Sequence, residues 1–195
     1  MTARARNPRG EGGRLREDIL DAATRLLAGD ADAGPVSLRA VAKEVGIAPQ
    51  SMYLHFGDRT ELISAVIERR FAELLRACEL AVAKETGVSA KLRAFCTAYC
   101  LWGLQNPGHY RLLFESTATS QAGMSYEGSP GAEVFDRFLA VVKESAGDDA
   151  FKKAVLLWIA MHGIVSLRLN KPGFPWPRMN ELIDDFLRPL IKRPR

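Results

Sequence analysis

The stretch from residue 37 to residue 62 reads SLRAVAKEVGIAPQSMYLHFGDRTEL and predicts two short helices joined by a sharp turn. Ser37 can cap the free backbone N–H groups of the first helix, and Gly46 can end it because glycine tolerates a left-handed backbone. Pro49 fits the first turn of the second helix, where its missing N–H has no intrahelical partner. Asp58, followed three residues later by a glutamate, has the spacing of a capping box. These signals predict a helix-turn-helix that leads directly into a longer helix.

The outer face of the second helix carries hydrogen-bonding and apolar side chains rather than charges: Gln50, Ser51, Tyr53 and Leu54. Gln can pair bidentately with adenine, hydroxyl groups can reach bases or phosphates, and an apolar group can contact a thymine methyl. Side chains that can bind phosphate flank this face, namely Ser37, Arg39, His55 and Arg59. The pattern predicts binding in the major groove of double-stranded DNA. The alternatives are that Tyr53 belongs to the core and that GDRTEL is only a helix start.

The same residues resemble the DNA-binding signature of the tetracycline-repressor (TetR) family over residues 14–61. The resemblance rests on the alanine and glycine at the turn, then on Tyr53, one further residue, and His55 with Phe56 before the capped helix. It implies phosphate contacts for Ser37, Arg39, Tyr53, His55 and Arg59, and base contacts for Pro49, Gln50 and Ser51. The family usually has lysine where this chain has Arg59, so the charge is kept while the geometry of the contact changes.

The rest of the chain also has the apolar periodicity of helices, so the expected fold is all-α with about nine helices. We expect a flexible N-terminal arm at residues 1–13, the helix-turn-helix domain at 14–60, and a C-terminal effector-binding and dimerisation domain at 61–195. This last domain is expected to be an antiparallel helical bundle. Its helices are predicted at residues 60–84, 89–105, 109–115, 134–145, 150–169 and 179–191.

Two connecting segments and the N-terminal arm lie outside these predicted helices. Residues 116–131 are rich in Ser, Thr and Gly and predict a flexible loop, whereas residues 170–177, NKPGFPWP, predict a rigid connector. The arm contains Arg4, Arg6 and Arg9, which can reach into a minor groove, although a solvated tail is the simpler explanation.

The helix expected at residues 150–169 is apolar around much of its circumference, so it needs cover on nearly all sides. A second subunit can supply that cover, and a helix-turn-helix dimer reads two half-sites a fixed distance apart. The alternative is a helix wrapped by its own chain. The family resemblance implies a four-helix dimer interface built from residues 150–169 and 179–191.

The C-terminal part also resembles a TetR subgroup that carries a Trp-His-Gly triplet. The match consists of Met161-His162-Gly163, preceded by Trp158, together with the segment NPGHYRLLFE. Met161 stands where the subgroup has tryptophan.

The resemblance further implies a pocket for a small-molecule effector among the middle helices. Ligand pockets are mostly apolar and aromatic with a few polar groups, and the candidates of that kind are Phe95, Tyr99, Trp102, His109, Phe114, Trp158 and His162. Such a pocket suits a largely apolar effector. The alternative is that these aromatic side chains are ordinary core residues and that His162 is a hydrogen-bonded core histidine.

Composition disfavours several other classes of protein. With 195 residues, 47% of them hydrophobic and 26% charged, the chain can bury a substantial core, and its net charge of +4 is modest for a nucleic-acid binder. It has no apolar run of the length of a membrane span and no signal-peptide pattern, so we expect a cytoplasmic protein with no membrane partner. Its three cysteines are interpreted as buried thiols, and we expect no metal and no cofactor.

An enzyme is disfavoured because the sequence lacks a Gly-rich phosphate loop and a His-Glu-x-x-His motif. The leading hypothesis is a homodimeric, ligand-responsive transcriptional repressor that binds a palindromic operator. A non-specific or architectural DNA-binding protein is the main alternative, and a helical enzyme or a protein-interaction module is less favoured.

Overall fold

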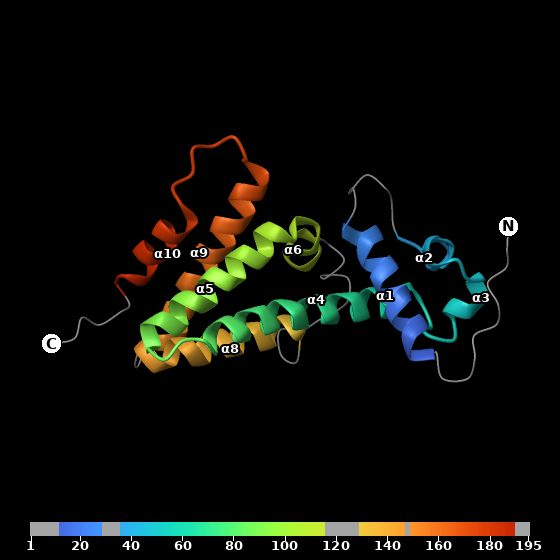
Figure 1. Ribbon diagram of the computed structural model, residues 1–195, viewed down its shortest axis with the longest axis horizontal. Coiled ribbons are helices and arrows are strands. Elements are labelled where there is room, and N and C mark those ends of the chain that lie inside the picture. The colour runs from blue at the N-terminus through green and yellow to red at the C-terminus, as the bar shows by residue number, and fades with distance from the viewer. Residues whose placement is uncertain (1–11, 29–35, 116–128, 147–148, 190–195) are drawn as a thin grey trace. The chain divides into compact units, whose positions relative to one another are not determined.

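The structure is a computed structural model that describes residues 12–28, 36–115, 129–146 and 149–189 (Figure 1). Within those ranges it contains nine helices and no strand, so the expected all-α fold is confirmed. Most of the predicted N-terminal arm, including Arg4, Arg6 and Arg9, and most of the predicted loop at residues 116–131 lie outside the described residues.

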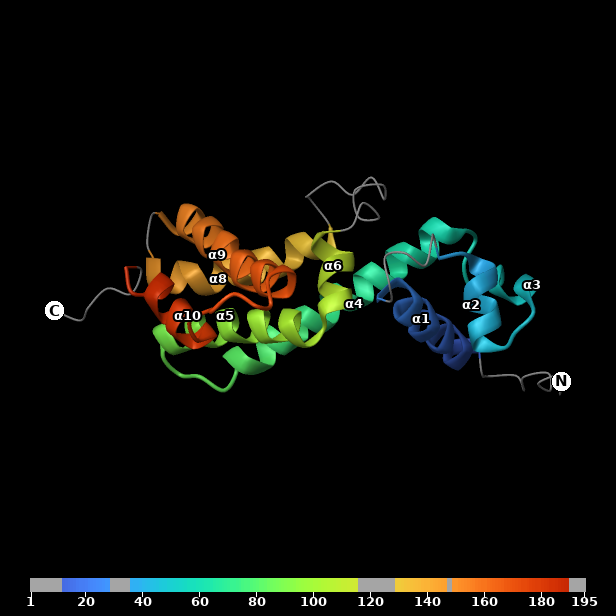
Figure 2. The same ribbon diagram turned by 90° about the horizontal axis from the view of Figure 1, so that it is seen from above.

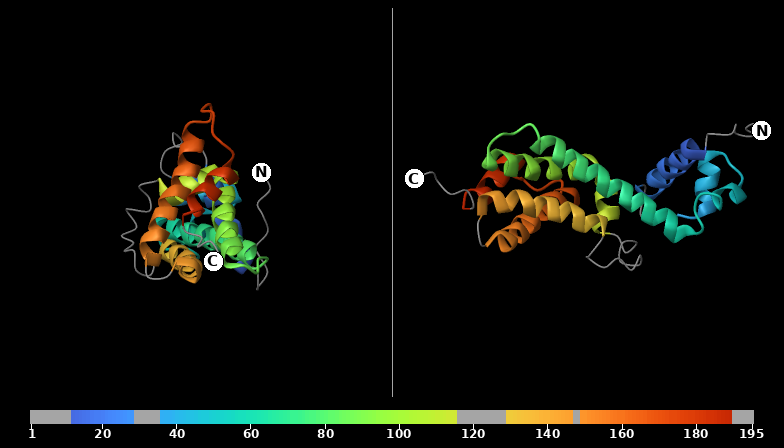
Figure 3. Two further views of the ribbon diagram at one scale, coloured as in Figure 1. Left: turned by 90° about the vertical axis from the view of Figure 1, so that its left-hand side faces the viewer. Right: turned by 90° about the horizontal axis from the view of Figure 1, so that it is seen from below.

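The chain forms two compact units. The first comprises Met1–Arg70 and Gly108–Met124, and the second comprises Phe71–Pro107 and Ser125–Arg195. The helix α4 (Arg59–Val82) leaves the first unit and enters the second without interruption (Figure 3). The boundary expected at residue 60 lies in the first turn of this helix, and the functional limits of the two domains stay a prediction.

The first unit is built from α1 (Gly12–Ala28), α2 (Leu38–Val45), α3 (Pro49–Met52), the first half of α4 and most of α6 (Pro107–Phe114). In Figure 2, α1 lies beside α2, which is followed by the short α3. The helices meet through fully or almost fully buried apolar side chains: Ile19, Leu20, Ala23, Val41, Ala42, Met52, Phe56, Leu62, Val66 and Ile67. This core fixes the helix-turn-helix to the start of α4.

The turn between α2 and α3 forms as its sequence predicts. The Ser37 hydroxyl accepts a hydrogen bond from the Ala40 N–H at 3.1 Å, which caps α2. Gly46 ends that helix with φ at 76°, and the Ile47 N–H donates to the Ala42 carbonyl. Because a left-handed residue is favourable only for glycine here, the turn depends on Gly46.

The second helix of the motif is shorter than expected. Regular α3 ends at Met52, and the chain continues to His55 in tight turns whose Leu54 and His55 N–H groups bond three residues back. The Phe56 N–H donates to the Met52 carbonyl, four residues back, which keeps a roughly helical course. Phe56 is buried at the end of this segment, directly before the chain turns into α4.

The start of α4 departs slightly from the predicted capping box. Asp58 caps the helix, because its carboxylate accepts from the Glu61 N–H at 2.8 Å. The Glu61 carboxylate accepts from Gly57 rather than from Asp58, at 2.6 Å. The two carboxylates therefore still satisfy two backbone N–H groups at this helix start, those of Gly57 and Glu61.

The second unit consists of the second half of α4, α5 (Val88–Gln105), α8 (Pro130–Ala146), α9 (Ala150–Asn170) and α10 (Met179–Leu187). The helix α9 packs on α5 and α8, and the short α10 lies on α5 and α9 (Figure 2). Its buried core includes Leu74, Cys78, Leu92, Phe95, Cys96, Tyr99, Cys100, Phe138, Val142, Ala154 and Val165.

Two helix limits in this unit correct the sequence-based expectation. The helix α8 starts at Pro130, inside the predicted loop, because Ser129 caps it by accepting from the Ala132 N–H at 3.1 Å. The helix α10 ends at Leu187, four residues before the expected limit.

At Gly131 a Cβ atom would lie 3.1 Å from the Phe71 ring, so glycine permits this close approach of α8 to α4.

Among the described residues one helix, α9, is long and apolar enough by composition to cross a membrane, and 33% of its most apolar window is buried within the chain. A single helix of this kind is weak evidence of a membrane span, because core and interface helices meet the same criterion.

Candidate nucleic-acid interface and effector region

Most of the predicted DNA-binding side chains are exposed at one end of the first unit. Ser37, Arg39, Pro49, Gln50, Tyr53 and Arg59 are exposed, and Ser51 and His55 are half-buried. Tyr53 is 63% exposed, so the alternative that it belongs to the core does not hold. The roles of these residues in DNA binding stay predictions.

The segment that carries Tyr53 and Leu54 is anchored from behind. Met52 and Phe56 are buried, and the Arg16 guanidinium of α1 lies 5.0 Å from the centre of the Phe56 ring. A cation over an aromatic face adds to the apolar anchoring. The backbone between the two anchors therefore presents its intervening side chains to solvent.

Arg59 makes a contact that the sequence does not reveal. Its Nε donates to the backbone carbonyl of Val36 at 2.7 Å and so ties the first turn of α4 to the residue before the α2 cap. An arginine can make this bond through Nε while the two terminal amino groups of the guanidinium still point elsewhere, whereas lysine has one nitrogen. The only sequence signal was arginine in place of the family's usual lysine.

Ion pairs join the helices behind the interface. Arg69 of α4 pairs with Glu17 at 3.2 Å and with Asp21 at 2.7 Å, both on α1. Arg25 of α1 pairs with Glu44 of α2 at 3.3 Å. Exposed pairs of this kind each contribute about 0–1 kcal/mol, so they help to orient the helices without dominating their stability.

Some of the predicted effector residues form one aromatic cluster in the second unit. The rings of Tyr99, Trp158 and His162 lie with centroids 5.2–5.6 Å apart, and the Tyr99 hydroxyl is 3.0 Å from His162 Nε2. Phe138 extends the cluster to Phe95 and Trp158, with ring centroids 5.0 and 6.0 Å away. The contact between the Tyr99 hydroxyl and His162 supplies the hydrogen bond expected of a core histidine. It also places one polar pair among apolar rings.

The other predicted effector residues lie elsewhere. Trp102 is buried on α5 and accepts at its carbonyl from the Asn106 side chain. His109 and Phe114 lie on α6, and the ring of Phe114 is 5.0 Å from that of Tyr110. Burial, and secondly the nearby positive charge of Arg70, lowers the pKa of His109 below its usual value.

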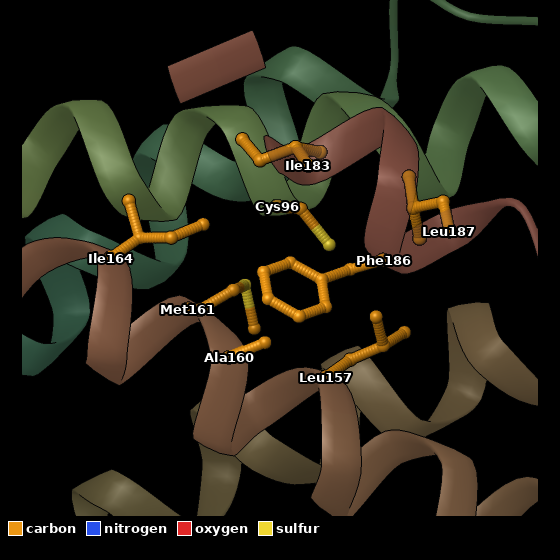
Figure 4. A pocket seen from close by; sticks show the side chains of 8 residues that line it. All are labelled: Cys96, Leu157, Ala160, Met161, Ile164, Ile183, Phe186 and Leu187. Carbon is orange, nitrogen blue, oxygen red and sulfur yellow. The ribbon is translucent and has the colours of Figure 1, made fainter. Parts of the chain in front are cut away.

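Figure 4 shows a small apolar pocket between α5, α9 and α10 that sequence reasoning missed. The Phe186 ring lies among its other lining side chains, which are Cys96, Leu157, Ala160, Met161, Ile164, Ile183 and Leu187. None of the predicted effector residues lines it. Ordinary apolar residues from three separate helices carry no local signal, so only their packing identifies the pocket.

The cysteines of the second unit are free and buried. Burial raises the pKa of the Cys100 thiol to about 12 and also raises the pKa of Cys78 and Cys96 well above the usual range. Such thiols are poor nucleophiles and poor metal ligands near neutral pH. Over the ranges that the structure describes, no group of three or more His, Cys, Asp or Glu side chains is placed to hold a metal ion.

Comparison with known proteins covers both units. A family model described as "Bacterial regulatory proteins, tetR family" matches residues 19–66, and one described as "Tetracyclin repressor-like, C-terminal domain" matches residues 92–192. The second model spans more than half of the chain. The assignment to the subgroup with the Trp-His-Gly triplet stays a prediction.

Solved structures share the fold. A protein of unknown function from Rhodococcus sp. RHA1 is 28% identical, with a TM-score of 0.77 over 96% of this chain and 100% of that one. A TetR-like transcriptional regulator from the same organism is 21% identical, with a TM-score of 0.67 and coverage of 95% and 96%. A TetR family transcription regulator from Marinobacter aquaeolei VT8 is 19% identical, with a TM-score of 0.69 and coverage of 92% and 95%. Together with the two family models and the exposed helix-turn-helix, these matches show that the chain belongs to the TetR family of DNA-binding transcriptional regulators, which are not enzymes.

Proposed function

We propose that the protein is a homodimeric repressor that binds a palindromic operator and leaves it when a largely apolar small molecule binds the second unit. The observation that carries the proposal is the exposed set on α3 and the turn after it, where Gln50, Tyr53 and Leu54 project from a backbone anchored by Met52 and Phe56. A neutral, hydrogen-bonding face on a rigid support suits base recognition rather than purely ionic binding.

The face of α9 supports the homodimer. Leu156, Ile159 and Leu167 are all more than half exposed and recur at helical spacing, and Phe186 of α10 is 45% exposed. An apolar helix face left open by its own chain favours a second protein surface. A second copy is the simplest occupant, because it brings the same surface and gives two reading heads related by two-fold symmetry.

The aromatic cluster supports the effector response. The rings of Tyr99 and Trp158 and the hydrogen-bonded His162 combine apolar side chains with a single polar pair, which suits an apolar ligand with one hydrogen-bonding group. Because Tyr99 is buried, entry of a ligand requires the cluster to open. A ligand can release the operator only if it binds the DNA-incompetent conformation more tightly than the competent one.

Operator binding also implies that the protein works in the cytoplasm.

The test is selection of bound fragments from a random duplex library with the purified full-length protein at near-physiological salt. We expect enrichment of a palindrome whose half-sites keep a fixed separation. Weak binding without an enriched motif would contradict the proposal and favour a non-specific, architectural DNA-binding protein, whose affinity comes from phosphates alone.

The selected duplex then tests the effector response. Small apolar compounds are screened for release of the labelled duplex, and Tyr99→Phe removes the hydroxyl at His162. We expect an effector that depends on the cluster to lose affinity in this variant while operator affinity stays the same. An effector that binds the variant equally well would place the effector site elsewhere in the second unit.

A further inference from the structure

Leu54 is the most exposed of the large hydrophobic side chains that the structure describes, at 84%. A single exposed leucine is common and by itself indicates nothing. This one lies in the middle of the predicted DNA-reading segment, between Tyr53 and His55, and the fold gives it no packing role.

The backbone holds Leu54 on the same face as Gln50. Tyr53 has helical angles, with φ at −68° and ψ at −11°, and the Phe56 N–H bonds to the Met52 carbonyl four residues back. Residues four apart on a helical course are neighbours on one face. Because Met52 and Phe56 occupy the opposite, buried side, Leu54 cannot turn into the core without displacing them.

We propose that Leu54 contributes to operator specificity by packing on the 5-methyl group of a thymine in the major groove, close to the base that Gln50 contacts. The thymine methyl is the apolar feature of the major-groove edge, and a leucine has no donor or acceptor with which to read any other base. The inference rests on the proposed operator binding. It adds that each half-site contains a thymine whose methyl group Leu54 contacts.

The experiment uses the duplex most enriched from the random library. Each thymine of a half-site is replaced in turn by deoxyuridine, which pairs identically and lacks only the methyl group, and affinity is measured by fluorescence anisotropy. For the wild-type protein we expect one position per half-site at which the replacement weakens binding about fourfold, the value of one buried methyl group.

Leu54→Ala completes the comparison. This variant removes the methyl contact in both half-sites, so it should bind the unmodified duplex about 15-fold more weakly, which is about fourfold for each half-site. It should also lose its sensitivity to deoxyuridine at that one position. Leu80→Ala is the matched control, because Leu80 is an exposed leucine of the second unit, 55% exposed, and should leave the whole pattern unchanged. Both variants should stay close to the wild-type melting temperature, since Leu54 and Leu80 are 84% and 55% exposed.

The outcomes separate this inference from the proposed function. If the duplex is bound selectively but deoxyuridine changes nothing at any position, the thymine contact is overturned and the repressor proposal stands. If Leu54→Ala remains as sensitive to deoxyuridine as wild type, another side chain contacts the methyl group and the assignment to Leu54 is overturned. If no duplex is selected, both proposals fail together.

Discussion

Arg59 combines two tasks at one position. Its Nε bond to the Val36 carbonyl fixes the guanidinium beside Ser37, whose hydroxyl caps α2. The family resemblance assigns a phosphate contact to Arg59, and the remaining donors of the guanidinium are available for it. A lysine at this position can bind phosphate but cannot also hold the Val36 carbonyl in the same geometry. The arginine therefore links the start of α4 to the start of α2 in addition to carrying the charge.

Two substitutions of Arg59 separate these tasks. Arg59→Lys keeps the charge, so we expect an unchanged salt dependence of operator binding, with a stability loss of about 1 kcal/mol or less from the missing hydrogen bond. Arg59→Gln removes the charge, so the slope of log K against log salt should fall by about 1 for each subunit. The measurements are anisotropy titrations between low and physiological salt, together with urea unfolding. A reduced slope in Arg59→Lys would show that the charge alone does not make the phosphate contact.

At the scale of the element, the turn between α2 and α3 depends on one backbone conformation. Gly46 has φ at 76°, and a Cβ atom there would meet nothing within 4 Å. Any loss on adding a side chain therefore comes from the backbone rather than from a clash.

We expect Gly46→Ala to lower the free energy of unfolding by about 1–2 kcal/mol, the cost of a left-handed alanine. Gly13→Ala is the control, because Gly13 lies in α1 with equally open surroundings and helical geometry that favours alanine. Urea unfolding of the full chain should show a loss in the first variant and none in the second. Equal stability of Gly46→Ala and wild type would mean that the turn can adopt another conformation.

Elements that depend on local chemistry could be predicted from the sequence, and those that depend on packing could not. The cap at Ser37, the stop at Gly46, the start at Pro49 and the cap at Asp58 are confirmed because each involves residues within four positions of one another. The early end of α3 at Met52 escaped prediction because residues 53–56 contain no local stop signal such as glycine or proline.

In the candidate sites, too, local features could be predicted from the sequence and contacts between distant residues could not. The exposed reading face follows from helical periodicity, which is a local property, whereas the bond from Arg59 to Val36 joins residues 23 positions apart. The pocket around Phe186 needs side chains from three helices. The family resemblance and residue type also suggested seven aromatic and histidine residues for the effector pocket without separating those in the Tyr99 cluster from those on α6.

At the scale of the whole molecule, α9 carries the argument for the proposed dimer. This 21-residue helix has the composition of a membrane span, yet only 33% of its most apolar window is buried within its own chain. Its exposed residues Leu156, Ile159 and Leu167 would leave an apolar row along one side of the helix in water. Such a row favours association, and cover by a second copy agrees with the two half-sites that a helix-turn-helix dimer requires.

Ile159, 61% exposed near the middle of this row, gives the sharpest test of the dimer. Ile159→Glu should leave the folded chain intact but convert it to a monomer, because a buried unpaired carboxylate opposes association. Sedimentation equilibrium should then give the mass of one chain, and operator affinity should fall about a hundredfold or more as the second half-site no longer acts together with the first. Leu80→Glu is the matched control, since it places the same charge at a comparably exposed apolar position on α4 and should remain dimeric. If Ile159→Glu stayed dimeric and kept its operator affinity, the two copies would have to meet through another surface, and the exposed row on α9 would have to bind a different partner.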